Sequence, residues 1–132
     1  MLNERRPRIL INCSNLHVGG AVAVATSFID NLSRQYNDDL DISLLVSSIV
    51  YSNIQASEID LNVFEHCTIH DYYGIRAIWQ GLDKYFENRD LVFTVFGPAY
   101  FLFKKTRHVF GFAQPHIIYP NNPIEKRMSV IS

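Results

Sequence analysis

Two adjacent glycines, Gly19 and Gly20, stand between a short apolar run and a segment with helical periodicity. Because glycine has no Cβ, the backbone there can approach a ligand closely and can adopt a positive φ. The helix that follows would direct unpaired N–H groups and a partial positive charge at the same place. The pair therefore suits a phosphate group or a sugar hydroxyl, and a plain strand-to-helix turn is an equally good interpretation of the spacing alone.

The sequence lacks the two best-known phosphate-binding loops. The fingerprint G-x-G-x-x-G is absent, and the second apolar run ends in Ser47-Ser48 rather than in the acidic residue that holds a ribose. No Gly-Lys-Ser or Gly-Lys-Thr occurs, which excludes a P-loop. We therefore expect neither a dinucleotide-dependent enzyme nor a P-loop phosphotransferase.

The segment EHCTIHD brings His66, Cys67 and His70 close together in the sequence. On a helix the two histidines would share a face, as metal ligands do. We expect a strand instead, in which residues four apart lie ~13 Å from each other. Since a histidine nitrogen lies ~2.1 Å from a bound zinc ion, one ion cannot bind both side chains. We predict no metal site here.

Two further groups near the C-terminus could contribute chemistry. His116, in the segment AQPHIIYP, could donate to a ligand oxygen or act as an acid or base, although a structural role is slightly favoured. Lys104, Lys105, Arg107 and His108 form a small basic cluster. Such a cluster is most commonly a set of solvated charges in a loop. The alternative is that it binds an anionic phospholipid or a lipid-diphosphate acceptor.

Length and composition set the broad class of the protein. The 132 residues predict one domain, 1–132, with 48% hydrophobic and 19% charged residues. A formal net charge of -1 gives no electrostatic case for nucleic-acid binding. Cys13 and Cys67 form no C-x-x-C pair and are expected as reduced thiols. No apolar run approaches the ~18 residues of a membrane span, so we expect a cytoplasmic protein and leave contact with the inner face of the membrane open.

Strands and helices are expected to alternate along the chain. Strands are predicted at 9–13, 42–46, within 63–70, at 91–96 and at 109–112; helices are predicted at about 20–36, near 52–59, and from Gly74 to about Asn88. Strands that are apolar throughout indicate an α/β fold with a doubly wound, mainly parallel sheet. Ligands bind at the carboxyl ends of such strands. Three loops should therefore meet there, namely 14–20, 97–100 and 113–116.

Three segments together resemble a known family. ILINCSNLHVGGAVAVATSFIDNL is similar to the opening strand, glycine loop and first helix of family-4-like glycosyltransferases with the GT-B fold. LVFTVFGPAYF and HVFGFAQPHIIYP look like later strands and loops of the same Rossmann-like N-terminal half. The resemblance is nearest to bacterial enzymes of surface-polysaccharide synthesis and runs over most of the chain.

The resemblance implies a reaction and a set of site residues. The N-terminal half would bind a glycan or lipid-linked acceptor, and sugar would be transferred from a nucleotide-sugar co-substrate with retention of configuration and without a further cofactor. Gly19 and Gly20 would lie near the donor diphosphate and stabilise its developing charge. Asn15 and His17 would flank the acceptor. The opposite wall would comprise Gly97, Pro98 and Gln114, with His116 as the candidate catalytic residue.

Two departures from the family pattern qualify this expectation. Relatives often carry a histidine directly after the fifth strand, where this chain has Ala113 or Gln114 and His116 comes slightly later. The C-terminal nucleotide-sugar domain is also absent from this chain, which predicts little transferase activity for the chain alone. The alternative is a stand-alone α/β binding or interaction module without catalysis, which could cover the edge of its sheet by forming a homodimer.

Overall fold

The computed structural model describes residues 5–36, 38–73, 76–96 and 106–111. Its elements, in chain order, are β1 (Arg8–Cys13), α1 (Gly20–Gln35), β2 (Asp41–Val46), α2 (Ser48–Ala56), β3 (His66–Ile69), α3 (Arg76–Trp79), α4 (Asp83–Phe86), β4 (Leu91–Thr94) and β5 (Arg107–Phe110). The five strands form one sheet in the order β3-β2-β1-β4-β5, and every pair in it is parallel. The predicted α/β fold with a Rossmann-like parallel sheet is confirmed.

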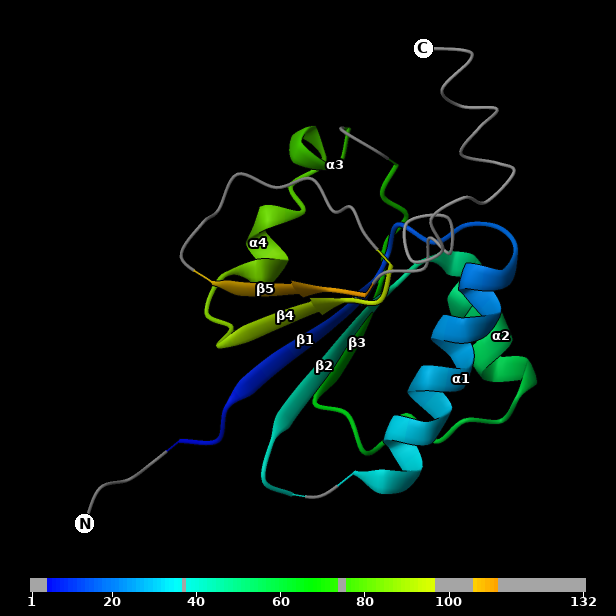
Figure 1. The fold of residues 1–132 in the computed structure, drawn as a ribbon, viewed down its shortest axis with the longest axis horizontal. Helices are drawn as coiled ribbons and strands as arrows, with labels where there is room; N and C mark the ends of the chain where they lie inside the picture. The colour runs from blue at the N-terminus through cyan, green and yellow to red at the C-terminus, as the bar shows by residue number, and fades with distance from the viewer. Residues whose placement is uncertain (1–4, 37, 74–75, 97–105, 112–132) are drawn as a thin grey trace, which may run out of the picture.

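The helices lie on both faces of the sheet. α1 and α2 lie together on one side, and α3 and α4 lie on the other (Figure 1). The strand order explains this division, because the chain moves outward from β1 to β3 and then returns past β1 to β4. Right-handed crossovers that run in opposite directions place their helices on opposite faces of a sheet.

Each face has its own hydrophobic core, and β1 supplies both. Ile11 and Cys13 belong to the core beneath α1 and α2, whereas Leu10 belongs to the core beneath α4. Because successive side chains of a strand point to opposite faces, Asn12 points the same way as Leu10. An amide is thus buried on the α4 side of the central strand, where it is fully shielded from solvent.

α1 forms where the sequence predicts it. Val22, Ala25 and Ile29 recur at steps of three and four residues and are all buried against the sheet. Gly19 is the N-cap, with φ 71°, which a residue without Cβ adopts readily. Tyr36 ends the helix with an extended backbone, φ -59° and ψ 136°.

The expectation of one long helix from Gly74 to about Asn88 is wrong. Two single-turn helices, α3 and α4, occupy this region. Gly81 lies between them with φ 79°, a left-handed conformation that ends a helix. The apolar stripe still reports burial, since Leu82 and Phe86 are both buried beneath the sheet. The spacing of apolar residues thus identified the side chains that are buried, but it did not identify the break between α3 and α4.

Several predicted boundaries also differ from the structure: β4 ends at Thr94 rather than at 96, and α2 ends at Ala56 rather than at 59. α2 begins at Ser48, four residues before the predicted 52, because the Ser47 hydroxyl accepts a hydrogen bond from Val50 N at 3.3 Å and caps the helix. β5 begins at Arg107 rather than at Val109, and the predicted last residue, Phe112, lies outside the described residues. An exposed arginine on an outer strand does not interrupt pairing. The strand was predicted to begin too late because the prediction followed the apolar residues alone.

Among the glycines that the structure describes, Gly111 is the one that leaves no room for a Cβ. Its N–H donates to Thr94 O at 2.8 Å, and a Cβ built on it would lie 1.9 Å from Val95 O. Gly111→Ala should therefore lower the free energy of unfolding by roughly 1–3 kcal/mol, as overpacking does. Gly20→Ala is the matched control, because its Cβ would meet nothing within 4 Å. Urea unfolding should separate the two variants, and equal midpoints would contradict this account of Gly111.

Candidate functional site

The loop that follows β1 lies at the place where the sheet reverses its direction of growth. β1 is flanked by β2 on one side and by β4 on the other, and the connections of these two strands lie on opposite faces. In open parallel sheets such a switch point, at the carboxyl ends of the strands, is where ligands bind. Residues 14–19 occupy this position, between β1 and α1.

A buried chain of polar side chains fixes the base of this loop. Asn12 Oδ1 accepts hydrogen bonds from Ser14 N at 3.1 Å and from Ser14 Oγ at 2.6 Å. Asn12 Nδ2 donates to Thr94 Oγ1 at 3.2 Å, which joins β1 to β4. All three residues have no solvent exposure. Since buried polar groups are costly unless paired, this chain holds the start of the loop in one position.

His108 on β5 continues the chain. Its Nε2 lies 2.6 Å from Thr94 Oγ1, the oxygen that also accepts from Asn12 Nδ2. Burial lowers the pKa of His108 to about 4, so the ring is neutral near pH 7. The basic cluster predicted at 104–108 therefore loses one of its charges. Arg107 is exposed on β5, and Lys104 and Lys105 lie outside the described residues.

Asn15 ties the loop to the segment after β4. Its Nδ2 donates to Phe96 O at 2.8 Å, across the switch point. Leu16, the next residue, is buried, and its carbonyl oxygen accepts a hydrogen bond from the Ser47 hydroxyl. The loop is thereby held to both neighbouring strands, β4 on one side and β2 on the other.

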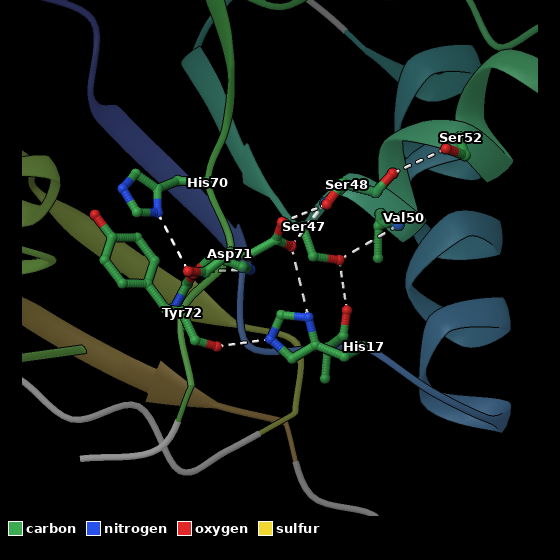
Figure 2. Close-up of polar contacts among 11 residues, drawn as sticks. His17, Ser47, Ser48, Val50, Ser52, His70, Asp71 and Tyr72 are labelled. Atoms are coloured by element: carbon green, nitrogen blue, oxygen red, sulfur yellow. Dashed lines mark hydrogen bonds and ion pairs between the residues drawn. The ribbon is translucent and has the colours of Figure 1, made fainter. Parts of the chain in front are cut away.

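His17 connects the loop to the end of β3. Its Nε2 donates to Tyr72 O at 2.7 Å, and its Nδ1 lies 3.6 Å from Asp71 Oδ1 (Figure 2). Its ring stacks on that of Tyr73, with centroids 4.0 Å apart and an interplanar angle of 12°. Both ring nitrogens thus face protein acceptors, so His17 serves to position the loop.

Asp71 lies over the N-terminus of α2. It accepts hydrogen bonds from Ser48 N at 2.9 Å and from the Ser48 hydroxyl (Figure 2). The Ser48 hydroxyl bond, the Ser48 backbone bond and the neighbouring His17 and His70 together hold the pKa of Asp71 below its ordinary value, against a smaller opposing effect of desolvation. The α2 N-terminus is therefore closed by a carboxylate of the protein itself.

The N-terminus of α1 is open by contrast. Among the described residues no side chain caps it, and its first turn contains no acidic residue. Gly19 and Gly20 are exposed, and a Cβ built on either would meet no atom of another part of the chain within 4 Å. The start of a 16-residue helix, with two exposed glycines, thus lies at the switch point, where an anionic or hydroxyl-bearing ligand could accept from N–H groups of its first turn.

Four of the predicted site residues lie together on this one loop: Asn15, His17, Gly19 and Gly20. The predicted opposite wall, Gly97, Pro98 and Gln114, and the candidate catalytic His116 lie outside the described residues. Sequence reasoning missed Asp71 and Ser48. The available signal was their position directly after predicted strands, the same signal that identified the first loop.

The EHCTIHD segment forms a strand, as predicted, with His66 and Cys67 in β3 and His70 beyond its end. In the part of the chain that the structure describes, no three His, Cys, Asp or Glu side chains could hold a metal ion. Burial raises the pKa of the Cys67 thiol. For Cys13 burial, with a smaller effect of Cys67, raises the thiol pKa to about 12, which makes that thiol unreactive.

A groove of about 380 Å³ lies elsewhere, between α1 and α2. Its lining includes Ala23, Thr26 and Asp30 of α1 and Asn53 and Ala56 of α2. These residues lie along the helices, away from the polar groups at the carboxyl ends of the strands. We therefore place the candidate site at the loop and not in this groove.

Comparison with known proteins gives no identification: no family model, curated protein or solved structure matches the chain. Within the described ranges, no helix is both long enough and apolar enough to cross a membrane.

Asp71→Asn tests the closure of α2. Because the pKa of Asp71 is lowered on folding, its contribution to stability is present above the unfolded pKa and is lost as pH falls through the folded pKa. The variant should unfold with a free energy about 1 kcal/mol lower near pH 7, a figure discounted for solvent screening. The difference should shrink as pH is lowered toward about 3. Asp38→Asn, at an exposed carboxylate, is the control; a pH-independent difference for Asp71→Asn would contradict the interpretation.

His108→Gln tests the neutral histidine. The unfolded chain takes up a proton near the ordinary pKa of 6.5, whereas folded His108 does so only near 4, so the wild type loses stability as pH falls between these values. From about pH 7 to about pH 4.5 it should lose roughly 1–2 kcal/mol more than the variant, after allowance for partial exposure. Unfolding by urea at several pH values measures this. His66→Gln, at an exposed histidine, should not reproduce the effect.

Proposed function

We propose that this chain is the N-terminal, acceptor-side half of a glycosyltransferase that moves a sugar from a nucleotide-sugar donor to a glycan or lipid-linked acceptor. Bacterial surface-polysaccharide synthesis is the process that the three segments quoted from the sequence suggest. The observation that carries the proposal is the open N-terminus of α1 at the switch point, formed by Gly19 and Gly20. Under the proposal most of the donor site belongs to a second domain.

The chemistry of the donor fits such a helix end. When the bond between the sugar and its phosphate breaks, the nucleoside diphosphate is the leaving group. Negative charge then develops on the phosphate oxygen that held the sugar. Backbone N–H groups that are already oriented toward that oxygen stabilise it without reorganisation. A loop fixed through Asn12, Asn15 and His17 supplies such orientation, and the two glycines leave room for the phosphate.

The polar loop residues that the resemblance places beside the acceptor also have contacts within the protein. Asn15 donates to Phe96 O, and His17 contacts Tyr72 O and Asp71. We assign them to positioning the loop. The acceptor would then lie against groups beyond His17, toward the ends of β2 and β3.

A stand-alone interaction module is the second candidate, because one edge of the described sheet carries exposed apolar residues. Val109 and Phe110 on β5 are 48% and 42% exposed. Exposed apolar strands at a sheet edge invite pairing with another chain. A second copy of the protein paired along β5 would bury them.

Gly20→Trp in the longest natural protein that contains this chain distinguishes the two candidates. Position 20 is exposed and a Cβ there would meet nothing within 4 Å, so the protein should fold, while transfer from nucleotide-sugar donors falls about 100-fold. Gln35→Trp, at the exposed far end of α1, is the matched control and should keep full transfer. The measurement is product formation with a panel of nucleotide-sugars, alongside thermal unfolding.

Unchanged transfer in Gly20→Trp would remove the loop from the reaction. Absence of transfer by the wild-type protein with every donor, together with a stable dimer in light scattering, would favour the interaction module.

A further inference from the structure

Tyr73 presents one face of its ring to solvent at the carboxyl end of the sheet. The other face is covered, since it stacks on His17 at a centroid distance of 4.0 Å. The residue nevertheless remains 54% exposed. His17 is itself held by Tyr72 O and faces Asp71. Tyr73 is therefore a flat aromatic surface supported from behind, and not a side chain that projects freely into water.

Two polar groups lie around the same histidine. Asp71 lies 3.6 Å from the same imidazole on which Tyr73 stacks, so its carboxylate and the tyrosine ring flank one histidine. Ser48 contacts the carboxylate and is exposed at the start of α2. A carboxylate has about four lone-pair sites, so Asp71 can accept from a ligand while it is bonded to Ser48. His17 has no such capacity, because both of its nitrogens face protein acceptors.

We propose that Tyr73, Asp71 and Ser48 form a binding surface for a pyranose sugar. A pyranose has an apolar face of C–H groups and a rim of hydroxyls. Its C–H face would lie on the exposed face of Tyr73, and hydroxyls at one edge would donate to Asp71 and exchange hydrogen bonds with Ser48. The assignment of this sugar as the acceptor rests on the proposed transferase function, whereas the binding surface itself does not.

The position of the surface agrees with this role. It lies at the ends of β2 and β3, and His17 links it to the loop that carries Gly19 and Gly20. An acceptor there would lie beside the place proposed for the donor diphosphate. The carboxyl ends of parallel strands are also where ligands of such sheets bind.

The charge beside Tyr73 favours a sugar over an anionic membrane surface. Asp71 is ionised near pH 7, since its pKa lies below the ordinary value, and an ionised carboxylate repels anionic lipid headgroups. A ring laid flat against His17 also cannot project into a bilayer interface as anchoring aromatics do. Trp79 on α3 is 86% exposed and is not part of this surface.

Binding of methyl pyranosides tests the proposal on the chain as it exists. The glucoside, the galactoside and the N-acetylglucosaminide should be titrated separately, with Tyr73 ring resonances and ligand saturation transfer as readouts. Saturation should reach the C–H protons of at least one of them. Tyr73→Ala should raise its Kd roughly tenfold, the loss expected for one aromatic stack. Tyr73→Phe should bind as the wild type does, because it keeps the ring.

Two variants make the result specific. Asp71→Asn should raise the same Kd about tenfold, as loss of a charged hydrogen-bond acceptor does. Trp79→Ala is the matched aromatic control and should leave the Kd unchanged. Equal binding by wild type and Tyr73→Ala, or loss of binding in Trp79→Ala alone, would overturn the proposal. Binding of the chain to phosphatidylglycerol vesicles that depends on Tyr73, without binding of any pyranoside, would also overturn it.

Pyranoside binding needs neither a donor nor turnover, so the test is separate from that of the transferase. Tyr73-dependent binding in a protein without transfer would support the sugar-binding surface and contradict the proposed transferase function. Transfer that is unaffected by Tyr73→Ala, with no pyranoside bound, would support the proposed transferase function and contradict the sugar-binding surface.

Discussion

The whole site depends on the burial of one amide, that of Asn12, in the central strand. Asn12 points to the face of the sheet where Leu10 and Phe86 form part of a core and is fully buried, so its amide must bond within the protein. Asn12 meets this constraint by accepting from Ser14 and donating to Thr94. The same two bonds fix the start of the first loop and join it to β4. A rigid switch point is therefore a consequence of satisfying a buried polar group.

The N-termini of the two long helices, α1 and α2, differ in how their unpaired N–H groups are satisfied. Both begin at the carboxyl edge of the sheet, and both therefore present unpaired N–H groups there. α2 is closed by the Ser47 hydroxyl and the Asp71 carboxylate, which satisfy those groups internally. α1 begins with two exposed glycines and carries no side-chain cap within the described residues. Of these two helix ends, only the α1 N-terminus is left, within the described residues, without a side-chain cap on its N–H groups.

His17 couples these two helix ends. It belongs to the loop before α1, yet its ring contacts Tyr72 and Asp71 after β3. A change at Asp71 can thus reach the glycine loop through one imidazole ring. The arrangement also gives Tyr73 a firm support, so that positioning of the loop and presentation of an aromatic surface depend on the same residue.

The sequence by itself determined the alternation of strands and helices, the parallel sheet, and the glycine loop after the first strand, because hydrophobic periodicity and glycine placement report burial and local backbone conformation. It did not determine the break at Gly81 or the start of α2, which depend on local geometry and on a cap. The cluster of His17, Ser48, Asp71 and Tyr73 was decided by the tertiary structure alone. His17 and Tyr72 are 55 residues apart, and only the strand order β3-β2-β1 brings their loops together. Periodicity shows which face is buried but not which neighbour covers it.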